Sequence, residues 1–126
     1  MLIGIFIPVS IISCRTSYET ISPQGINKSI QASDKSITKP EELMRVIYPY
    51  SDNQSVEVSW KKARNKSHTY IITLIHSDIK DDSIEAYKYV VTAERKDVIW
   101  RVIEIKRAHK CRRGRGHINW GTDLCH

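Results

Sequence analysis

The residues best suited to chemistry lie near the C-terminal end of the sequence. Two cysteines, Cys111 and Cys125, enclose a loop that contains three glycines and can therefore turn back on itself. In an oxidising compartment we expect such a pair to form a disulfide, and the alternative is two reduced thiols, as in a cytosolic protein. Closing a loop of about 15 residues stabilises a fold by roughly 3 kcal/mol in the chain-entropy model.

The same segment also offers ligands for zinc. Structural zinc is held by cysteine sulfur and histidine nitrogen, and these groups are supplied by His109, Cys111, His117, Cys125 and His126. Their spacing matches no standard zinc motif, and a bond between the two cysteines would remove two ligands. We therefore expect no metal and no other cofactor, with zinc as the competing interpretation.

Between the two cysteines, the loop combines arginines with an aromatic ring. Guanidinium groups suit phosphate and carboxylate, and an exposed indole can stack on a sugar or base or lie at a lipid interface. The candidate residues for binding an anionic ligand are Arg112, Arg113, Arg115 and Trp120. The alternative interpretation places Trp120 against the sheet edge beneath the loop.

The positive charge of the chain is concentrated in one segment. The whole chain has a net charge of +6, from 20 Lys and Arg against 14 Asp and Glu. Residues 101–115 contain seven basic residues and one acidic residue, which also gives +6, so the rest of the chain sums to zero. Such a patch favours an anionic partner, namely lipid headgroups, an acidic glycan or nucleic acid. A solvated, charge-rich strand and loop is the other interpretation.

No catalytic motif is present in the sequence. We find no glycine-rich phosphate loop, nucleophile elbow or paired-histidine motif. The adjacent carboxylates Glu41-Glu42 and Asp81-Asp82 are better explained as helix-start and turn residues. We therefore expect that the protein is not an enzyme.

The N-terminal segment, residues 1–13, reads MLIGIFIPVSIIS and has no charged side chain. As a helix it would span about 20 Å, less than the roughly 30 Å hydrocarbon core, so it suits a signal peptide better than a permanent anchor. Its last three residues and the one that follows, Ile11-Ile12-Ser13-Cys14, resemble the lipobox of bacterial lipoproteins. The resemblance implies that Cys14 becomes the acylated first residue of the mature protein. The alternatives are secretion without a lipid and a buried strand of a cytosolic protein.

With Cys14 acylated, Cys111 and Cys125 would remain as an even pair. Residues 14–38 contain many Ser, Thr, Asn and Gln. This composition is typical of a flexible tether, and some 25 residues would reach on the order of 27 Å. The expected organisation is a signal peptide at 1–13, a polar tether at 14–38 and a small domain at 39–126.

The domain is expected to have an α+β fold. Thr38, Pro40 and Glu41 have the spacing of a helix start, which predicts a helix over about 39–48. From Val56 onward the apolar period changes to two. The expected strands are 56–61, 70–75, 84–93 and 98–110. Short polar connections favour a four-stranded antiparallel meander with one short N-terminal helix and a C-terminal disulfide-closed loop. In shape this resembles the cystatin-like small domains, a likeness that implies no function.

Together these features predict an exported accessory or binding module of the bacterial cell envelope. It would be anchored to a membrane, would face outside the cytoplasm, and would meet an anionic lipid or glycan through its basic C-terminal loop. The alternative is a small basic nucleic-acid-binding protein, which requires that the N-terminus is not an export signal.

Overall fold

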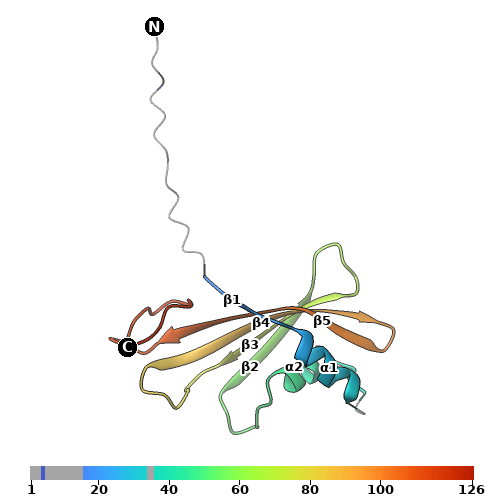
Figure 1. Cartoon of the computed structure of the whole chain (residues 1–126), viewed down its shortest axis with the longest axis horizontal. Coiled ribbons are helices and arrows are strands. Elements are labelled where there is room, and N and C mark those ends of the chain that lie inside the picture. The colour runs from blue at the N-terminus through green and yellow to red at the C-terminus, as the bar shows by residue number, and fades with distance from the viewer. Residues whose placement is uncertain (1–3, 5–15, 34–35) are drawn as a thin grey trace.

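A computed structural model describes residue 4 and residues 16–33 and 36–126 of the chain. All of its strands belong to one antiparallel sheet with the order β1-β5-β4-β3-β2 (Figure 1). In chain order the elements are β1 (Glu19–Ile21), α1 (Gln24–Ala32), α2 (Pro40–Ile47), β2 (Val56–Lys62), β3 (Thr69–His76), β4 (Ile84–Lys96) and β5 (Ile99–Cys111).

The predicted meander is present, but over the described residues the sheet has five strands rather than four, and two helices are formed rather than one. Strands β2 to β5 and helix α2 lie close to the predicted ranges. The additional elements β1 and α1 fall within 14–38, the range expected to be a flexible tether. β1 pairs with β5 through Glu19 and Arg107 and through Ile21 and Ile105. The expected tether is therefore part of the domain over residues 19–32.

Residues 19–32 have a polar composition because β1 and α1 bury few apolar side chains. β1 is a three-residue edge strand with no buried residue. Helix α1 likewise contains no buried residue, and of its apolar side chains Ile26 and Ile30 are partly buried where they pack against the core. Two partly buried side chains do not produce the sustained apolar period on which sequence-based assignment depends.

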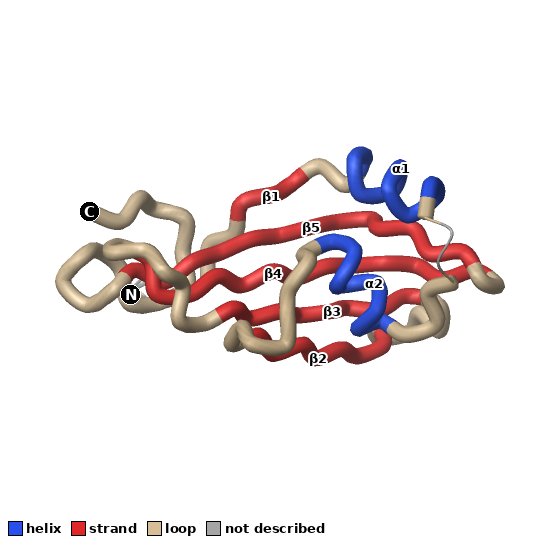
Figure 2. Tube along the Cα trace, turned by 90° about the horizontal axis from the view of Figure 1, so that it is seen from below, coloured by secondary structure: helices blue, strands red, loops and turns tan. Residues whose placement is uncertain are grey.

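The core lies between the two helices and one face of the sheet (Figure 2). Alternate residues of each long strand point toward this face, as the period of two requires. The largest fully buried side chains are Leu43, Met44, Ile72, Leu74, Val91, Val102 and Cys111. None of the described helices covers the opposite face of the sheet, which we call the open face.

The start of α2 is stabilised by Glu42 rather than by Glu41. The backbone N–H of Thr38 donates to Oε2 of Glu42 over 2.9 Å. This bond is the main reason why the pKa of Glu42 is lowered. Glu41 instead accepts a hydrogen bond of 2.7 Å from Nε1 of Trp60, which ties α2 to β2.

Candidate functional site

The C-terminal loop folds back along β5, as Figure 1 shows. The predicted disulfide between Cys111 and Cys125 is present, with the two Cα atoms 5.5 Å apart. Backbone hydrogen bonds hold the loop as well: His109 and Gly121 exchange N–H···O bonds of 2.9 and 3.0 Å, and the N–H of Cys111 donates to the carbonyl of His117 over 3.0 Å. The loop thus extends the cover that β1 provides along the edge of β5.

A glycine makes room for the disulfide. Gly116 has a φ of 145°, in the region that favours glycine. A Cβ atom at this position would lie 2.8 Å from Sγ of Cys111. A side chain here would therefore both strain the backbone and collide with the bonded sulfur.

The three candidate arginines have different environments. The guanidinium of Arg112 donates two hydrogen bonds, over 2.6 and 2.7 Å, to backbone carbonyls in the connection between β3 and β4. Arg115 donates to the backbone oxygen of His126 over 3.3 Å. Arg113 is exposed, and within the described chain it makes no hydrogen bond or ion pair. Arg112 and Arg115 therefore serve contacts inside the domain, and Arg113 is available to a ligand.

Trp120 is half-buried and lies beside lysines of the open face. Nζ of Lys110 is 4.6 Å and Nζ of Lys88 is 5.7 Å from the centroid of its ring, which are cation–π distances. Nζ of Lys88 is also 5.8 Å from the ring of Tyr18. We call these four residues, Tyr18, Lys88, Lys110 and Trp120, the Trp120 cluster.

The sequence analysis did not include Tyr18, Lys88 or Lys110 among the candidate residues. A partial signal was present in the alternation of β4, because Lys88 follows Tyr87 and precedes Tyr89, whose ring packs against the core. Lys88 must then point to the open face. The position of Tyr18 depends on the pairing of β1 with β5, which no pattern in the sequence indicated.

The basic segment of the sequence is not one patch in the structure. Alternation along β5 places Lys106 and Lys110 on the open face and directs Arg107 to the other face. Arg107 forms an ion pair with Glu19, and this hydrogen bond is the main reason why the pKa of Arg107 is raised. Lys106 lies 3.6 Å from the carboxylate of Glu104. The linear concentration of charge is thus divided between two faces and partly neutralised.

Four of the five residues considered for zinc come together beneath the loop. One potential ligand atom from each of His109, Cys111, His117 and Cys125 lies within 4.8 Å of the others. The rings of the two histidines are 4.9 Å apart, centroid to centroid. His126 is not a member of this group.

Backbone carbonyls surround the two imidazoles. Nε2 of His109 and Nε2 of His117 lie 2.7 and 2.9 Å from the carbonyl oxygen of Asp123. Nδ1 of His117 lies 2.7 Å from the carbonyl oxygen of Asn119. A carbonyl only accepts hydrogen bonds, so His117 satisfies both contacts when both of its nitrogens carry protons. The bonds to Asn119 and Asp123 accordingly raise the pKa of His117.

A second candidate site is a polar cleft of about 650 Å³ between the α2–β2 loop and the connection after β3. At its base the hydroxyl of Tyr48 lies 2.6 Å from Nδ1 of His76. Burial is the main reason why the pKa of Tyr48 is raised, so the hydroxyl keeps its proton at neutral pH. The sequence analysis assigned no role to either residue.

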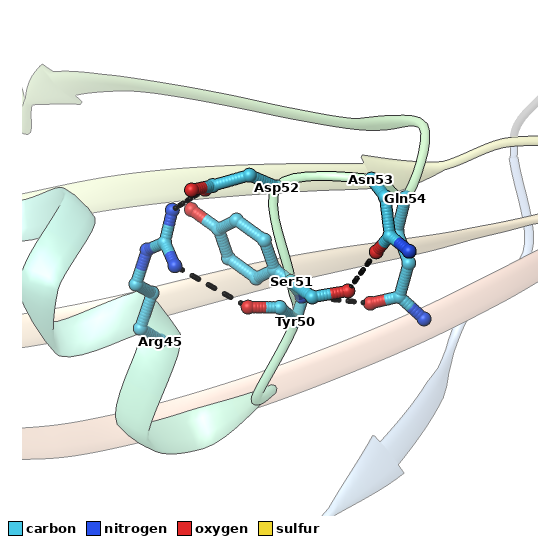
Figure 3. A network of polar contacts seen from close by, with 6 residues as sticks. All are labelled: Arg45, Tyr50, Ser51, Asp52, Asn53 and Gln54. Carbon is cyan, nitrogen blue, oxygen red and sulfur yellow. Dashed lines mark hydrogen bonds and ion pairs between the residues drawn. The ribbon is translucent and has the colours of Figure 1, made fainter.

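The rim of this cleft is held by the network drawn in Figure 3. Arg45 forms an ion pair of 3.0 Å with Asp52 and donates to the carbonyl of Tyr50 over 3.3 Å. The backbone N–H of Ser51 donates to the side chain of Gln54 over 2.9 Å. These contacts fix the loop locally, and the exposed ion pair contributes little to global stability.

The expected lipidation site, Cys14, lies outside the described residues. Among the described helices, none has the length and apolar character needed to cross a membrane. Comparison with known protein families, with curated proteins and with solved structures finds no match to this chain.

Proposed function

We propose that the protein is a module of the bacterial cell envelope that is anchored by an acylated Cys14 and contacts an anionic surface. The contact would be made by the Trp120 cluster together with Arg113. The observation that carries this proposal is the position of Lys88 and Lys110 at the ring of Trp120, on a sheet face that the described helices leave open. The proposed role is binding without catalysis.

The chemistry of the cluster suits the boundary between lipid and water. Indole rings are enriched at that boundary because they have an apolar body and a polar N–H. Ammonium groups attract phosphate, and each basic residue near an acidic membrane contributes about 1 kcal/mol, screened within a Debye length. Lys88 and Lys110 together would contribute about 2 kcal/mol, which is weak unless an anchor raises the effective concentration.

The position of Tyr18 supports an arrangement close to the membrane. Tyr18 comes four positions after Cys14, and four residues of fully extended chain span at most about 14 Å. Tyr18 in turn contacts Lys88. A lipid on Cys14 would therefore hold the Trp120 cluster close to the headgroups, and the long tether expected from the sequence is not needed.

The test measures vesicle binding by the chain from residue 14, with Cys14→Ser, so that neither the apolar segment nor a lipid contributes. Vesicles of phosphatidylglycerol are compared with vesicles of phosphatidylcholine at increasing salt. The variant is Lys88→Gln with Lys110→Gln. The matched control is Lys28→Gln with Lys66→Gln, which removes the same charge from exposed positions in α1 and the β2–β3 turn.

We expect salt-sensitive binding to the anionic vesicles, weakened about 30-fold in the Lys88 and Lys110 variant. The control should lose much less. Equal losses in both variants would contradict a specific surface and indicate a response to net charge alone. Tighter binding to a DNA duplex than to either vesicle would favour a nucleic-acid-binding role instead.

A further inference from the structure

We propose that His109, Cys111, His117 and Cys125 form a zinc site when the disulfide is reduced. The disulfide and the zinc ion would then be alternative cross-links of the same loop. The proposal rests on the convergence of four potential ligand atoms, two sulfurs and two imidazole nitrogens, within 4.8 Å of one another, and it does not depend on the membrane role.

Small side-chain movements would bring the four ligand atoms to the separations of a tetrahedral site. With Zn–S of about 2.3 Å and Zn–N of about 2.0 Å, the sulfurs of such a site are about 3.8 Å apart and the nitrogens about 3.3 Å apart. In the disulfide the two sulfurs are bonded, so they must separate after reduction, and the other ligand atoms, which now lie within 4.8 Å of one another, must approach a common centre. Both adjustments are within reach of side-chain rotation.

The loop has contacts that keep the ligands together after the disulfide is broken. His109 and Cys111 lie two residues apart on β5 and share one face of the sheet. The backbone hydrogen bonds of the loop do not involve sulfur. They are the two bonds between His109 and Gly121 and the bond from the N–H of Cys111 to the carbonyl of His117. These backbone bonds would hold His117 over the strand in either redox state.

Glycines leave the centre of the group open. A Cβ atom on Gly121 would lie 3.2 Å from Cε1 of His117, and one on Gly116 would meet Cys111. The absence of side chains at both positions gives the imidazole and the sulfurs space in which to rearrange around an ion.

The carbonyls that surround the histidines are suited to orient ligating imidazoles. A metal-bound histidine usually donates its other N–H to a carbonyl or carboxylate. His109 already donates from Nε2 to Asp123, which leaves Nδ1 for a metal. His117 can keep its bond from Nδ1 to Asn119 while Nε2 leaves Asp123 and turns to the ion.

Reduction and metal binding conserve electrons, protons and charge. A dithiol transfers two electrons and two protons to the bond between Cys111 and Cys125 and becomes a cyclic disulfide, which leaves two thiols on the protein. Zn²⁺ then displaces both thiol protons and the additional proton of His117, and two Zn–S and two Zn–N bonds form. The product has one dication, two thiolates and two neutral imidazoles, so its net charge is zero. Metal binding of this kind is coupled to proton release and becomes stronger as the pH rises.

The test uses the full chain in mild detergent, with Cys14→Ser to remove the third thiol. The protein is reduced, freed of reductant without air and titrated with Co²⁺, which reports its coordination by its spectrum. We expect one Co²⁺ per reduced chain, with the d–d bands of a tetrahedral ion and a thiolate charge-transfer band, and displacement by Zn²⁺. The oxidised chain should show neither band.

Histidine variants separate a four-ligand site from simple binding to thiols. His109→Ala and His117→Ala should each weaken Co²⁺ binding more than about 100-fold, since loss of a group that only orients a ligand already costs about 10–100-fold. His126→Ala is the matched control, because His126 lies outside the group, and it should bind as the parent does.

Each variant is first oxidised and shown to form the Cys111–Cys125 bond, which establishes that the loop still folds. If His117→Ala fails this check, His117→Cys replaces it, and that variant should bind Co²⁺ with a stronger thiolate band. Absence of Co²⁺ binding by the reduced parent would overturn the proposal. So would an unchanged affinity in both histidine variants.

Discussion

The side-chain amide of Asn27 pairs with both backbone groups of Val102. Nδ2 donates to the carbonyl of Val102 over 2.9 Å, and the N–H of Val102 donates to Oδ1 over 2.8 Å. This pair lies beside a bulge at Ile103, where the register between β4 and β5 shifts after Thr92. Asn27 therefore acts on the edge of β5 as a neighbouring strand would, and it docks α1 onto the sheet.

Replacing Asn27 by Asp is expected to release α1. The substitution preserves shape but removes the Nδ2 donor and directs a carboxylate oxygen at the carbonyl of Val102. We expect a loss of about 1–3 kcal/mol in the free energy of unfolding, measured by urea denaturation. Lys28→Ala, at the next and exposed position of the helix, should change stability by less than about 0.5 kcal/mol. Similar stabilities of the two variants would show that the amide pair does not stabilise the fold.

Reducing the disulfide is expected to lower the free energy of unfolding by about 3 kcal/mol, because the unfolded chain gains the entropy of an open loop of about 15 residues. The measurement is urea denaturation with and without reductant, in the presence of a chelator. Digestion of unreduced protein should yield Cys111 and Cys125 in one linked pair of peptides. Two thiols that alkylate freely in protein taken from its native compartment would contradict the bond.

Substitution of Gly116 by Ala is expected to impair the disulfide more than the same substitution at Gly114. Both residues have a positive φ, 145° and 84°. Only Gly116 would place a Cβ atom against Sγ of Cys111, whereas Gly114 has nothing within 4 Å. The readout is the fraction of disulfide formed on refolding in a glutathione buffer. Equal yields for the two variants would mean that backbone strain, and not the collision, sets the requirement for glycine.

The loop is expected to weaken as the pH rises. The pKa of His117 is raised above its ordinary value near 6.5, chiefly by the hydrogen bond to the carbonyl of Asn119 and then by that to Asp123. A group whose folded pKa is raised stabilises the fold fully below the unfolded pKa, and this contribution is lost as the pH passes through the folded pKa. Hydrogen exchange of the loop amides in oxidised, chelated protein should therefore show less protection, beyond the intrinsic pH effect, from about pH 6.5 upward.

Removal of the imidazole by His117→Gln should abolish this pH dependence. His126→Gln serves as the control, since His126 is exposed. An NMR titration midpoint of His117 below the ordinary histidine value of about 6.5 would contradict the imidazolium contacts.

Acylation of Cys14 is expected because of its lipobox-like context. Mass spectrometry of the membrane fraction should find an acylated Cys14 as the first residue, and Cys14→Ala should abolish the modification. An intact Met1 on a soluble cytosolic product would rule out both the lipid and the proposed envelope role.

Much of the fold could be predicted from local patterns. The alternation from Val56 to Trp60 marks β2, and the apolar run from Tyr70 to Ile75 marks β3 within a residue of its ends. Pro40 marks the start of α2. These signals are strong because each of these elements packs apolar side chains against the core at its own period.

The remaining elements are formed by contacts with residues far away in the chain. β1 is an edge strand held to β5 by backbone hydrogen bonds, which any residue except proline can donate. Helix α1 is docked through Asn27, a single polar side chain in a polar range. Neither element requires a periodic pattern of apolar residues, which is the signal from which helices and strands are predicted. For this reason the sequence predicts a flexible tether over both.

The sequence by itself determined the ligand types at the C-terminal end and the excess of positive charge. It predicted the pairing of Cys111 with Cys125, which the structure confirms. Only the tertiary structure decided which of these groups meet. The spacing of His109, Cys111, His117 and Cys125 matched no zinc motif, yet the return of the loop along β5 brings them together. The same return places Trp120 beside Lys88 and Lys110 and turns Arg112 inward. The physical reason is that loop closure depends on backbone pairing and on glycines that leave space. Neither produces a periodic pattern in the sequence, so the sequence does not indicate which distant side chains come into contact.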